Sequence, residues 1–220
     1  MLRYVMAIML LLSGSAVAAP ESWTKDSVRC EAEADCLKAL VGTAHREGDR
    51  LHLKLENGET KTLVGNEKAC LGDDAGECVI YDLRAHIPAL QAYVVGYRLY
   101  EGSGGIIVST KTGQALLLET LPEFSPDGRW FVSAGPDYAH GESLEPYDVT
   151  IWSYAPDASR EVFRYLAPRG RSLEYWEFAG WESNDRIRLK VRIVSVSDPE
   201  LEQDADAVRT DQGWKLNRPN

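Results

Sequence analysis

The chain has 220 residues, of which 44% are hydrophobic and 26% are charged, with 34 acidic and 24 basic side chains. This composition is typical of one globular domain or of two small ones, because disordered chains carry fewer apolar residues. The formal net charge is −10. It argues against binding to nucleic acid or to an anionic membrane surface, since both require clustered Lys and Arg.

Residues 1–18 are predicted to be a secretory signal peptide. One arginine precedes the apolar run at 4–12, which is too short to span a membrane and is followed by small residues. Cleavage after Ala18 is favoured, because Pro20 disfavours cleavage one residue later. We therefore expect a periplasmic or secreted protein without stable membrane insertion.

The four cysteines predict two disulfides, because an exported chain with an even number of cysteines usually pairs them. They are Cys30, Cys36, Cys70 and Cys78. Three pairings are possible in principle. The spacings match no common zinc site, so we expect neither a metal ion nor another cofactor.

Local geometry favours the pairing of near neighbours. Cys70 and Cys78 enclose two glycines that allow a tight reversal. A Cys30–Cys36 bridge follows by elimination, although six residues of continuous helix would rise about 9 Å and keep the sulfurs apart. We therefore expect a helix that starts late, with Asp35 as its N-cap and Cys30 in the preceding loop.

The rest of the chain predicts strands. After a short helical piece around 26–41, residues 51–56 and 59–64 alternate between apolar and polar, and Asn57-Gly58 between them predicts a type I′ turn. The other expected strands are 93–100, 105–109, 115–119, 130–134, 149–154, 161–166, 174–178, 186–196, 208–210 and 214–216. We expect an N-terminal disulfide-bearing segment with a short helix at 19–49 and an antiparallel all-β domain at 50–217.

Three strand-turn-strand units recur, with turns at Gly113, Asp157 and Gln212 that lie 44 and 55 residues apart. The run F-S-P-D-G-R-W at 124–130 resembles the blade-entry turn of TolB-type and WD-repeat-like β-propellers, and the resemblance covers about 91–216. It implies blade-like sheets in a small or incomplete propeller. A β-sandwich built from the same meander is the alternative.

The usual signatures of catalysis are absent from the sequence, which contains neither G-x-S-x-G nor H-E-x-x-H. The glycine-rich run at 102–105 is interpreted as a loop between strands, since no helix pattern follows it. Asp127-Gly128 is interpreted as a turn. Asp73 and Asp74 lack the alternating pattern of an EF-hand calcium loop and are interpreted as part of a solvated turn.

One segment is predicted to bind a partner. The connection 135–148 is longer than a hairpin requires, and its aromatic and acidic side chains suit a basic protein. The candidate binding residues are Asp137, Tyr138, His140, Glu142, Glu145 and Tyr147. The alternative is a tolerated insertion with a solvated acidic face.

The sequence thus predicts an exported, non-catalytic interaction module that presents loops from a β-scaffold to a protein or glycan partner. Two alternatives stay open. The first is a periplasmic inhibitor or immunity protein that blocks the basic cleft of a secreted cell-wall hydrolase. The second is a hydrolase without a recognisable motif, because paired carboxylates leave no local signature among 34 acidic residues.

Overall fold

The computed structural model describes residues 24–72, 74–135, 148–168, 172–195 and 200–218. Within them the strands form four antiparallel sheets, accompanied by one α-helix, α1 (Glu33–Ala39). The expected all-β class with a short N-terminal helix is confirmed. The expected N-cap is wrong, because the helix begins after Ala32 and Asp35 lies in its first turn.

Sheet 1 is a three-stranded meander. Its strands are β2 (Ala44–Glu47), β3 (Arg50–Lys54) and β4 (Thr60–Val64). The hairpin predicted around Asn57-Gly58 is confirmed, but the type I′ turn is wrong, because Gly58 has a φ of 86° and Asn57 has no positive φ. The Asn57 side-chain oxygen instead accepts a hydrogen bond of 2.9 Å from the Glu59 N–H and closes the loop.

Sheet 2 has five strands, in the order β1-β5-β6-β7-β8. They are β1 (Val28–Arg29), β5 (Ile80–Ile87), β6 (Ala92–Arg98), β7 (Ser103–Ser109) and β8 (Ala115–Leu118). The short 3-10 helix η3 (Pro88–Leu90) links β5 to β6. The loop interpretation of 102–105 is largely wrong, because Gly104 and Gly105 lie inside β7.

Sheets 3 and 4 are four-stranded meanders. Sheet 3 contains β9 (Glu123–Phe124), β10 (Trp130–Ala134), β11 (Val149–Ser153) and β12 (Arg160–Tyr165). Sheet 4 contains β13 (Ser172–Ser183), β14 (Arg186–Ser195), β15 (Leu201–Thr210) and β16 (Gly213–Asn217). The strands of both sheets follow chain order, and β15 is much longer than the expected 208–210.

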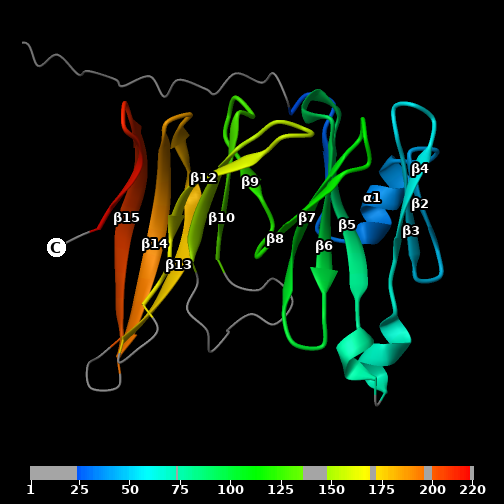
Figure 1. Ribbon diagram of the computed structural model, residues 1–220, viewed down its shortest axis with the longest axis horizontal. Helices are drawn as coiled ribbons and strands as arrows, with labels where there is room; N and C mark the ends of the chain where they lie inside the picture. Colours follow the sequence, from blue (N-terminus) through cyan, green and yellow to red (C-terminus); the bar gives the residue numbers. More distant parts are fainter. Residues whose placement is uncertain (1–23, 73, 136–147, 169–171, 196–199, 219–220) are drawn as a thin grey trace, which may run out of the picture.

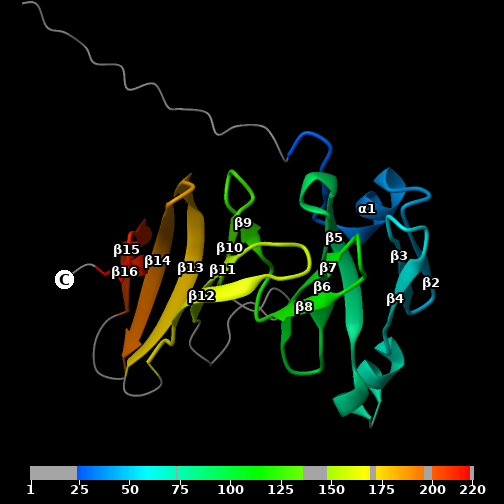
Figure 2. The ribbon, with the colours of Figure 1, turned by 45° about the horizontal axis from the view of Figure 1, so that its top comes forward.

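The four sheets lie side by side in an open row, as Figures 1 and 2 show from two directions. One core lies between sheets 1 and 2 and includes α1 and Leu83. A second core joins Val94 of sheet 2 to Phe131 of sheet 3, and a third joins Ile151 of sheet 3 to Trp176 of sheet 4. Sheets 2 and 3 are thus buried on both faces, which explains the nearly continuous apolar sequence of β7.

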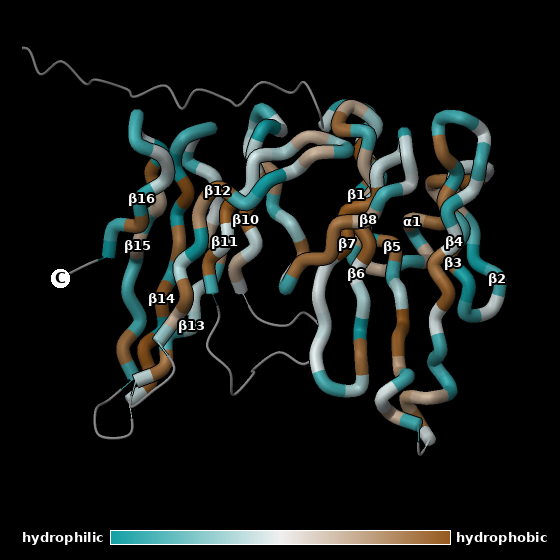
Figure 3. Tube along the Cα trace, in the orientation of Figure 1, coloured by the Kyte–Doolittle hydropathy of each residue, from teal (hydrophilic) through white to brown (hydrophobic). Residues whose placement is uncertain are grey.

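The outer face of sheet 4 is polar and forms one end of the row. Hydrophobic and hydrophilic residues alternate along β14 (Figure 3), and every second residue from Ile187 to Val191 is buried. On the other face Lys190 pairs with Glu202 at 2.8 Å, and Arg186 pairs with Asp206 at 2.7 Å. A polar outer face caps a stacked array and keeps its last unit soluble.

Side chains in the turns tie neighbouring sheets together. Between sheets 1 and 2, the Thr110 hydroxyl donates to the Glu56 carboxylate at 2.7 Å. Between sheets 2 and 3, the Asp157 carboxylate accepts hydrogen bonds from Ser109 at 2.9 Å and from Thr112 at 2.7 Å. These bonds hold the hairpin ends in one alignment along the row.

The Asp127-Gly128 pair forms a turn, as predicted. The Asp127 carboxylate accepts from the Ser125 hydroxyl at 2.7 Å and from the Arg129 N–H at 3.1 Å, while Gly128 takes a φ of 69°. Burial raises the pKa of Asp127, but these hydrogen bonds, together with the hydrogen bond and positive charge of the Arg129 side chain, outweigh it and leave the pKa below its usual value. The Asp127 N–H donates to the Asn184 side chain at 3.0 Å, which connects sheet 3 to sheet 4.

Both expected disulfides are confirmed. Cys30 and Cys36 have Cα atoms 5.5 Å apart, and Cys70 and Cys78 have Cα atoms 4.6 Å apart. The reversal between Cys70 and Cys78 does not depend on a positive φ at either enclosed glycine. Two 3-10 helices, η1 (Glu67–Leu71) and η2 (Ala75–Glu77), make it instead.

Candidate functional site

A cleft of about 620 Å³ lies between sheets 2 and 3, where their edge strands β1 and β9 approach each other. We call it the β1–β9 cleft. Its lining residues are Arg29, Cys30, Glu31, Arg84, Ala85, Val94, Leu121, Pro122 and Glu123. Ligand pockets in proteins commonly have volumes of about 300–1,000 Å³. The cleft therefore has the size of a binding site.

The floor and one wall of the cleft are apolar. Ala85 and Val94 are paired across β5 and β6, and only 5% and 6% of their surfaces are exposed. The connection that carries Leu121 crosses close over sheet 2, because an ideal Cβ on Gly105 would lie 2.6 Å from the Thr120 carbonyl oxygen. An apolar group that enters the cleft would meet this floor.

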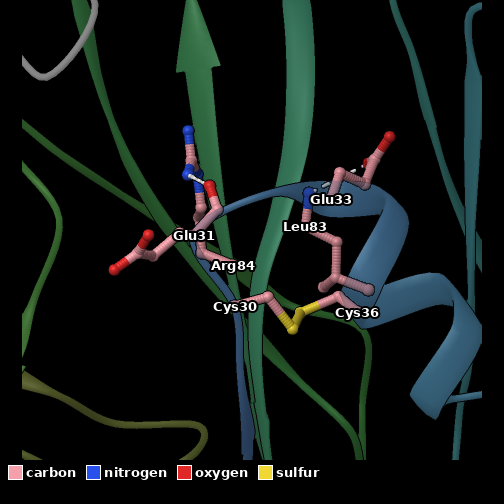
Figure 4. The surroundings of a disulfide bond; sticks show 6 residues. All are labelled: Cys30, Glu31, Glu33, Cys36, Leu83 and Arg84. Carbon is pink, nitrogen blue, oxygen red and sulfur yellow. Dashed lines mark hydrogen bonds between the residues drawn. A yellow bond between two sulfur atoms is a disulfide. The ribbon is translucent and has the colours of Figure 1, made fainter.

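The other wall is held by the first disulfide and its neighbours (Figure 4). The Cys30 N–H donates to the Arg84 carbonyl at 2.9 Å, and the Arg84 guanidinium donates to the Glu31 carbonyl. On the helix side of the bridge, Glu33 accepts a hydrogen bond of 3.0 Å from the Leu83 N–H. The Glu33 side chain thus satisfies a backbone N–H of β5 that the two-residue strand β1 leaves uncovered.

The rim of the cleft carries a charge pair that spans the two sheets. Arg29 of β1 lies 3.9 Å from the Glu123 carboxylate of β9, and 47% and 43% of these side chains are exposed. Such a long, half-exposed pair contributes only about 0–1 kcal/mol.

The Glu123 carbonyl accepts a hydrogen bond of 3.1 Å from the Trp181 indole, which holds β9 against sheet 4. Burial raises the pKa of Glu123, and Arg29 opposes that shift.

Replacing Glu123 by Gln is expected to raise the free energy of unfolding at pH 8 by less than about 1 kcal/mol. The folded chain holds the Glu123 proton more tightly than the unfolded chain, because burial raises the pKa. The contribution of Glu123 to the free energy of unfolding therefore falls as the pH rises through its raised pKa, and the variant lacks this fall. Urea denaturation at pH 4 and pH 8 measures the difference.

Glu202→Gln on sheet 4 is a matched variant that should change the pH dependence of stability in the opposite direction. Lys190 lowers the pKa of Glu202, so that carboxylate stabilises the fold more as the pH rises. Glu202→Gln should therefore lose stability relative to wild type at pH 8. If both variants change the pH dependence of stability in the same direction, the burial of Glu123 does not cause the pH dependence that Glu123 contributes.

The six loop residues predicted to bind a partner lie outside the described residues. They are Asp137, Tyr138, His140, Glu142, Glu145 and Tyr147. The flanking strands are confirmed, since β10 ends at Ala134 and β11 begins at Val149. Next to the segment, the Asp148 carboxylate accepts a hydrogen bond of 2.8 Å from the Ala167 N–H.

The charged residues of the β1–β9 cleft carry no clear signal in the sequence. Arg29 and Glu123 belong to two-residue strands, which are too short to produce a period-two pattern. Arg84 lies at a register shift in β5, between Leu83 and Ala85. The apolar pair L-P at 121–122, between two predicted strands, was the available signal of a buried connection.

Among the described residues, no three His, Cys, Asp or Glu side chains gather in a way that would hold a metal ion. No helix in the described part of the chain is long and apolar enough to cross a membrane. Comparisons with protein-family models, curated proteins and solved structures give no match. The resemblance of F-S-P-D-G-R-W to propeller blades therefore stays a prediction.

Proposed function

We propose that the chain is an exported binding module that holds a short extended segment of a partner protein in the β1–β9 cleft. The observation that carries this proposal is the position of a cleft of about 620 Å³ between the edge strands of two adjacent sheets. Export is supported by the signal-like residues 1–18 and by two disulfides, which persist in oxidising compartments.

An extended segment suits the walls of the cleft. β1 pairs with β5, β9 pairs with β10, and each strand ends its sheet. An extended peptide binds by adding its main chain to such an edge, while alternate side chains enter pockets. The floor formed by Ala85 and Val94 would take an apolar side chain of that peptide.

The charges at the rim favour a partner segment that carries both positive and negative residues. The lining includes two basic residues, Arg29 and Arg84, and two acidic residues, Glu31 and Glu123, so the cleft has no excess of either charge. The Arg29–Glu123 pair is long and half-exposed, and its separation costs little. A partner residue of either sign can therefore replace one member of the pair.

Selection of peptides from a random library on the immobilised protein, followed by fluorescence polarisation in solution, tests the proposal. Ala85→Phe fills the floor and is expected to weaken binding of the selected peptides at least tenfold, about 1.4 kcal/mol. Leu71→Phe is the matched control, because Leu71 is 91% exposed and lies outside the cleft. Equal binding by the two variants would contradict the proposal, provided that both melt like the wild type.

The salt dependence separates cleft binding from binding by the acidic segment 135–148. Cleft binding involves balanced charges and burial of apolar surface, so its affinity should change little between 50 and 300 mM salt. Capture of a basic partner by the acidic segment should weaken steeply over the same range. A steep loss of affinity with added salt would indicate that the segment 135–148 binds the partner and that the cleft does not.

A further inference from the structure

The edge strand β8 differs from the other strands that end a sheet. Each of the four sheets in the described part of the chain has two edge strands, and every one of them except β8 contains a charged residue. The sequence of β8 is A-L-L-L (Figure 3). Edge strands usually carry charges, because an uncharged edge offers its backbone to another strand. β8 therefore lacks the usual protection against pairing with a further strand.

The backbone groups on the free side of β8 come from Ala115 and Leu117. The Ser109 N–H donates to the Gln114 carbonyl at 2.9 Å, which turns the N–H and C=O groups of every second residue from Gln114 onward toward β7. The groups of Ala115 and Leu117 point the other way, toward the free edge. Each of these two residues offers one donor and one acceptor to a partner strand.

The side chains at this edge are apolar and differ in size. Leu117 is 65% exposed, which is the largest exposure of any large hydrophobic residue on the edge strands that the structure describes. Ala115 lies two residues away on the same face and is also exposed. Contact between Leu117 and another strand would remove apolar surface from water and favour association.

From these observations we propose that β8 pairs with β8 of a second copy of this chain in an antiparallel, two-fold symmetric dimer. Leu116 lies on the two-fold axis, opposite Leu116 of the second copy. Ala115 then lies opposite Leu117 of the second copy, and N–H···O=C bonds join the two residues. This register uses the free backbone groups of both residues and places each large Leu117 side chain beside a small Ala115 side chain.

The charges at the two ends of β8 favour a second copy over an unrelated strand. Lys111 lies in the turn before β8, whereas Glu119 follows β8, with 60% of its side chain exposed beside Arg164. Antiparallel pairing about Leu116 places Glu119 opposite Gly113 of the second copy, at the end of the turn that carries Lys111. The two-fold axis repeats this meeting of opposite charges at both ends of the strand pair.

Sedimentation equilibrium of the protein from about 1 µM to about 1 mM tests for the dimer. Because β8 has four residues, the interface is smaller than that of stable dimers, and the dissociation constant should lie between about 10 µM and about 1 mM. A protein that stays monomeric throughout this range would overturn the proposal. The outcome is independent of peptide binding, because no residue of β8 lines the β1–β9 cleft.

Leu117→Lys places a charge on the edge and should weaken dimerisation at least about tenfold. The exposure of Leu117 makes the change compatible with the fold, which the melting temperature checks. Val64→Lys is the matched control, because Val64 belongs to the edge strand β4 and is 52% exposed. It should leave dimerisation unchanged. Equal weakening by the two variants, or none by Leu117→Lys, would show that β8 is not the interface.

Cross-linking tests the register. Two residues on the axis of an antiparallel pair without hydrogen bonds between them have Cα atoms about 4.5 Å apart, which a disulfide can bridge. Under mild oxidation, Leu116→Cys should therefore form a covalent dimer faster than Val64→Cys at the same concentration. Equal rates for these two variants in the folded state would overturn the two-fold pairing about Leu116.

Discussion

Replacing Gly104 by Ala is expected to lower the free energy of unfolding by about 2–4 kcal/mol. An ideal Cβ at this position would lie 2.4 Å from the Leu118 carbonyl oxygen and 2.5 Å from the Tyr97 hydroxyl oxygen. Both contacts are far shorter than van der Waals distance. Because β8 is paired with β7 beside this glycine, the Leu118 carbonyl cannot retreat without disturbing that pairing.

The absence of a side chain at Gly104 also allows a specific hydrogen bond. The Tyr97 hydroxyl reaches across the strand and donates to the Leu118 carbonyl at 3.4 Å. A methyl group at Gly104 would occupy that path. We therefore expect the variant to lose both the close approach of β8 and this contact.

Urea denaturation of Gly104→Ala and Gly76→Ala provides the measurement. Gly76 has no positive φ, and an ideal Cβ there meets nothing within 4 Å. Gly76→Ala should stabilise the fold slightly, by up to about 1 kcal/mol, through a less flexible unfolded chain. Similar losses in the two variants would show that close packing is not the reason for glycine at position 104.

Gly104 illustrates which parts of the fold the sequence predicts. Long strands that are buried on one face carry their own signal, and the alternation in 186–196 correctly located β14. A run of glycines inside a fully buried strand has the same composition as a loop. Glycine is required at position 104 because the Leu118 carbonyl lies close to it, and a local sequence pattern does not reveal that contact.

The β1–β9 cleft was not predicted for a related reason. Its residues come from 29–31, 84–94 and 121–123, and they meet because sheet 3 stacks on sheet 2. Period-two patterns indicate which face of a strand is buried, but not which other sheet that face packs against. The disulfides were predictable because each closes a short local loop.

Removing the Arg218 side chain is expected to lower the free energy of unfolding by about 2–3 kcal/mol. The side chain of Glu174 is only 6% exposed, and its carboxylate accepts hydrogen bonds from Trp176 at 3.0 Å and from Tyr165 at 2.7 Å. Arg218 donates to the same carboxylate and supplies the positive charge. Without it, Arg218→Ala leaves a buried negative charge with neutral donors alone.

Arg218 also stabilises the neighbouring rings. Its guanidinium lies 5.8 Å from the centre of the Tyr165 ring and 5.9 Å from that of Trp176. Burial, with the nearby Glu174 carboxylate, raises the pKa of Tyr165 to about 12, and Arg218 opposes this rise. The Tyr165 pKa should therefore increase further in Arg218→Ala, which a spectrophotometric titration detects if the variant stays folded at high pH.

A double-mutant cycle separates the charge from the packing. If the uncompensated carboxylate causes the loss, Arg218→Ala should cost less than about 1 kcal/mol in a Glu174→Gln background, since the neutral amide needs no counter-ion. Lys190→Ala is the surface control, because Lys190 and Glu202 form their pair with 48% and 60% of the side chains exposed. Its removal should cost far less than the removal of Arg218. An equal cost of Arg218→Ala in both backgrounds would instead assign the effect to ring packing.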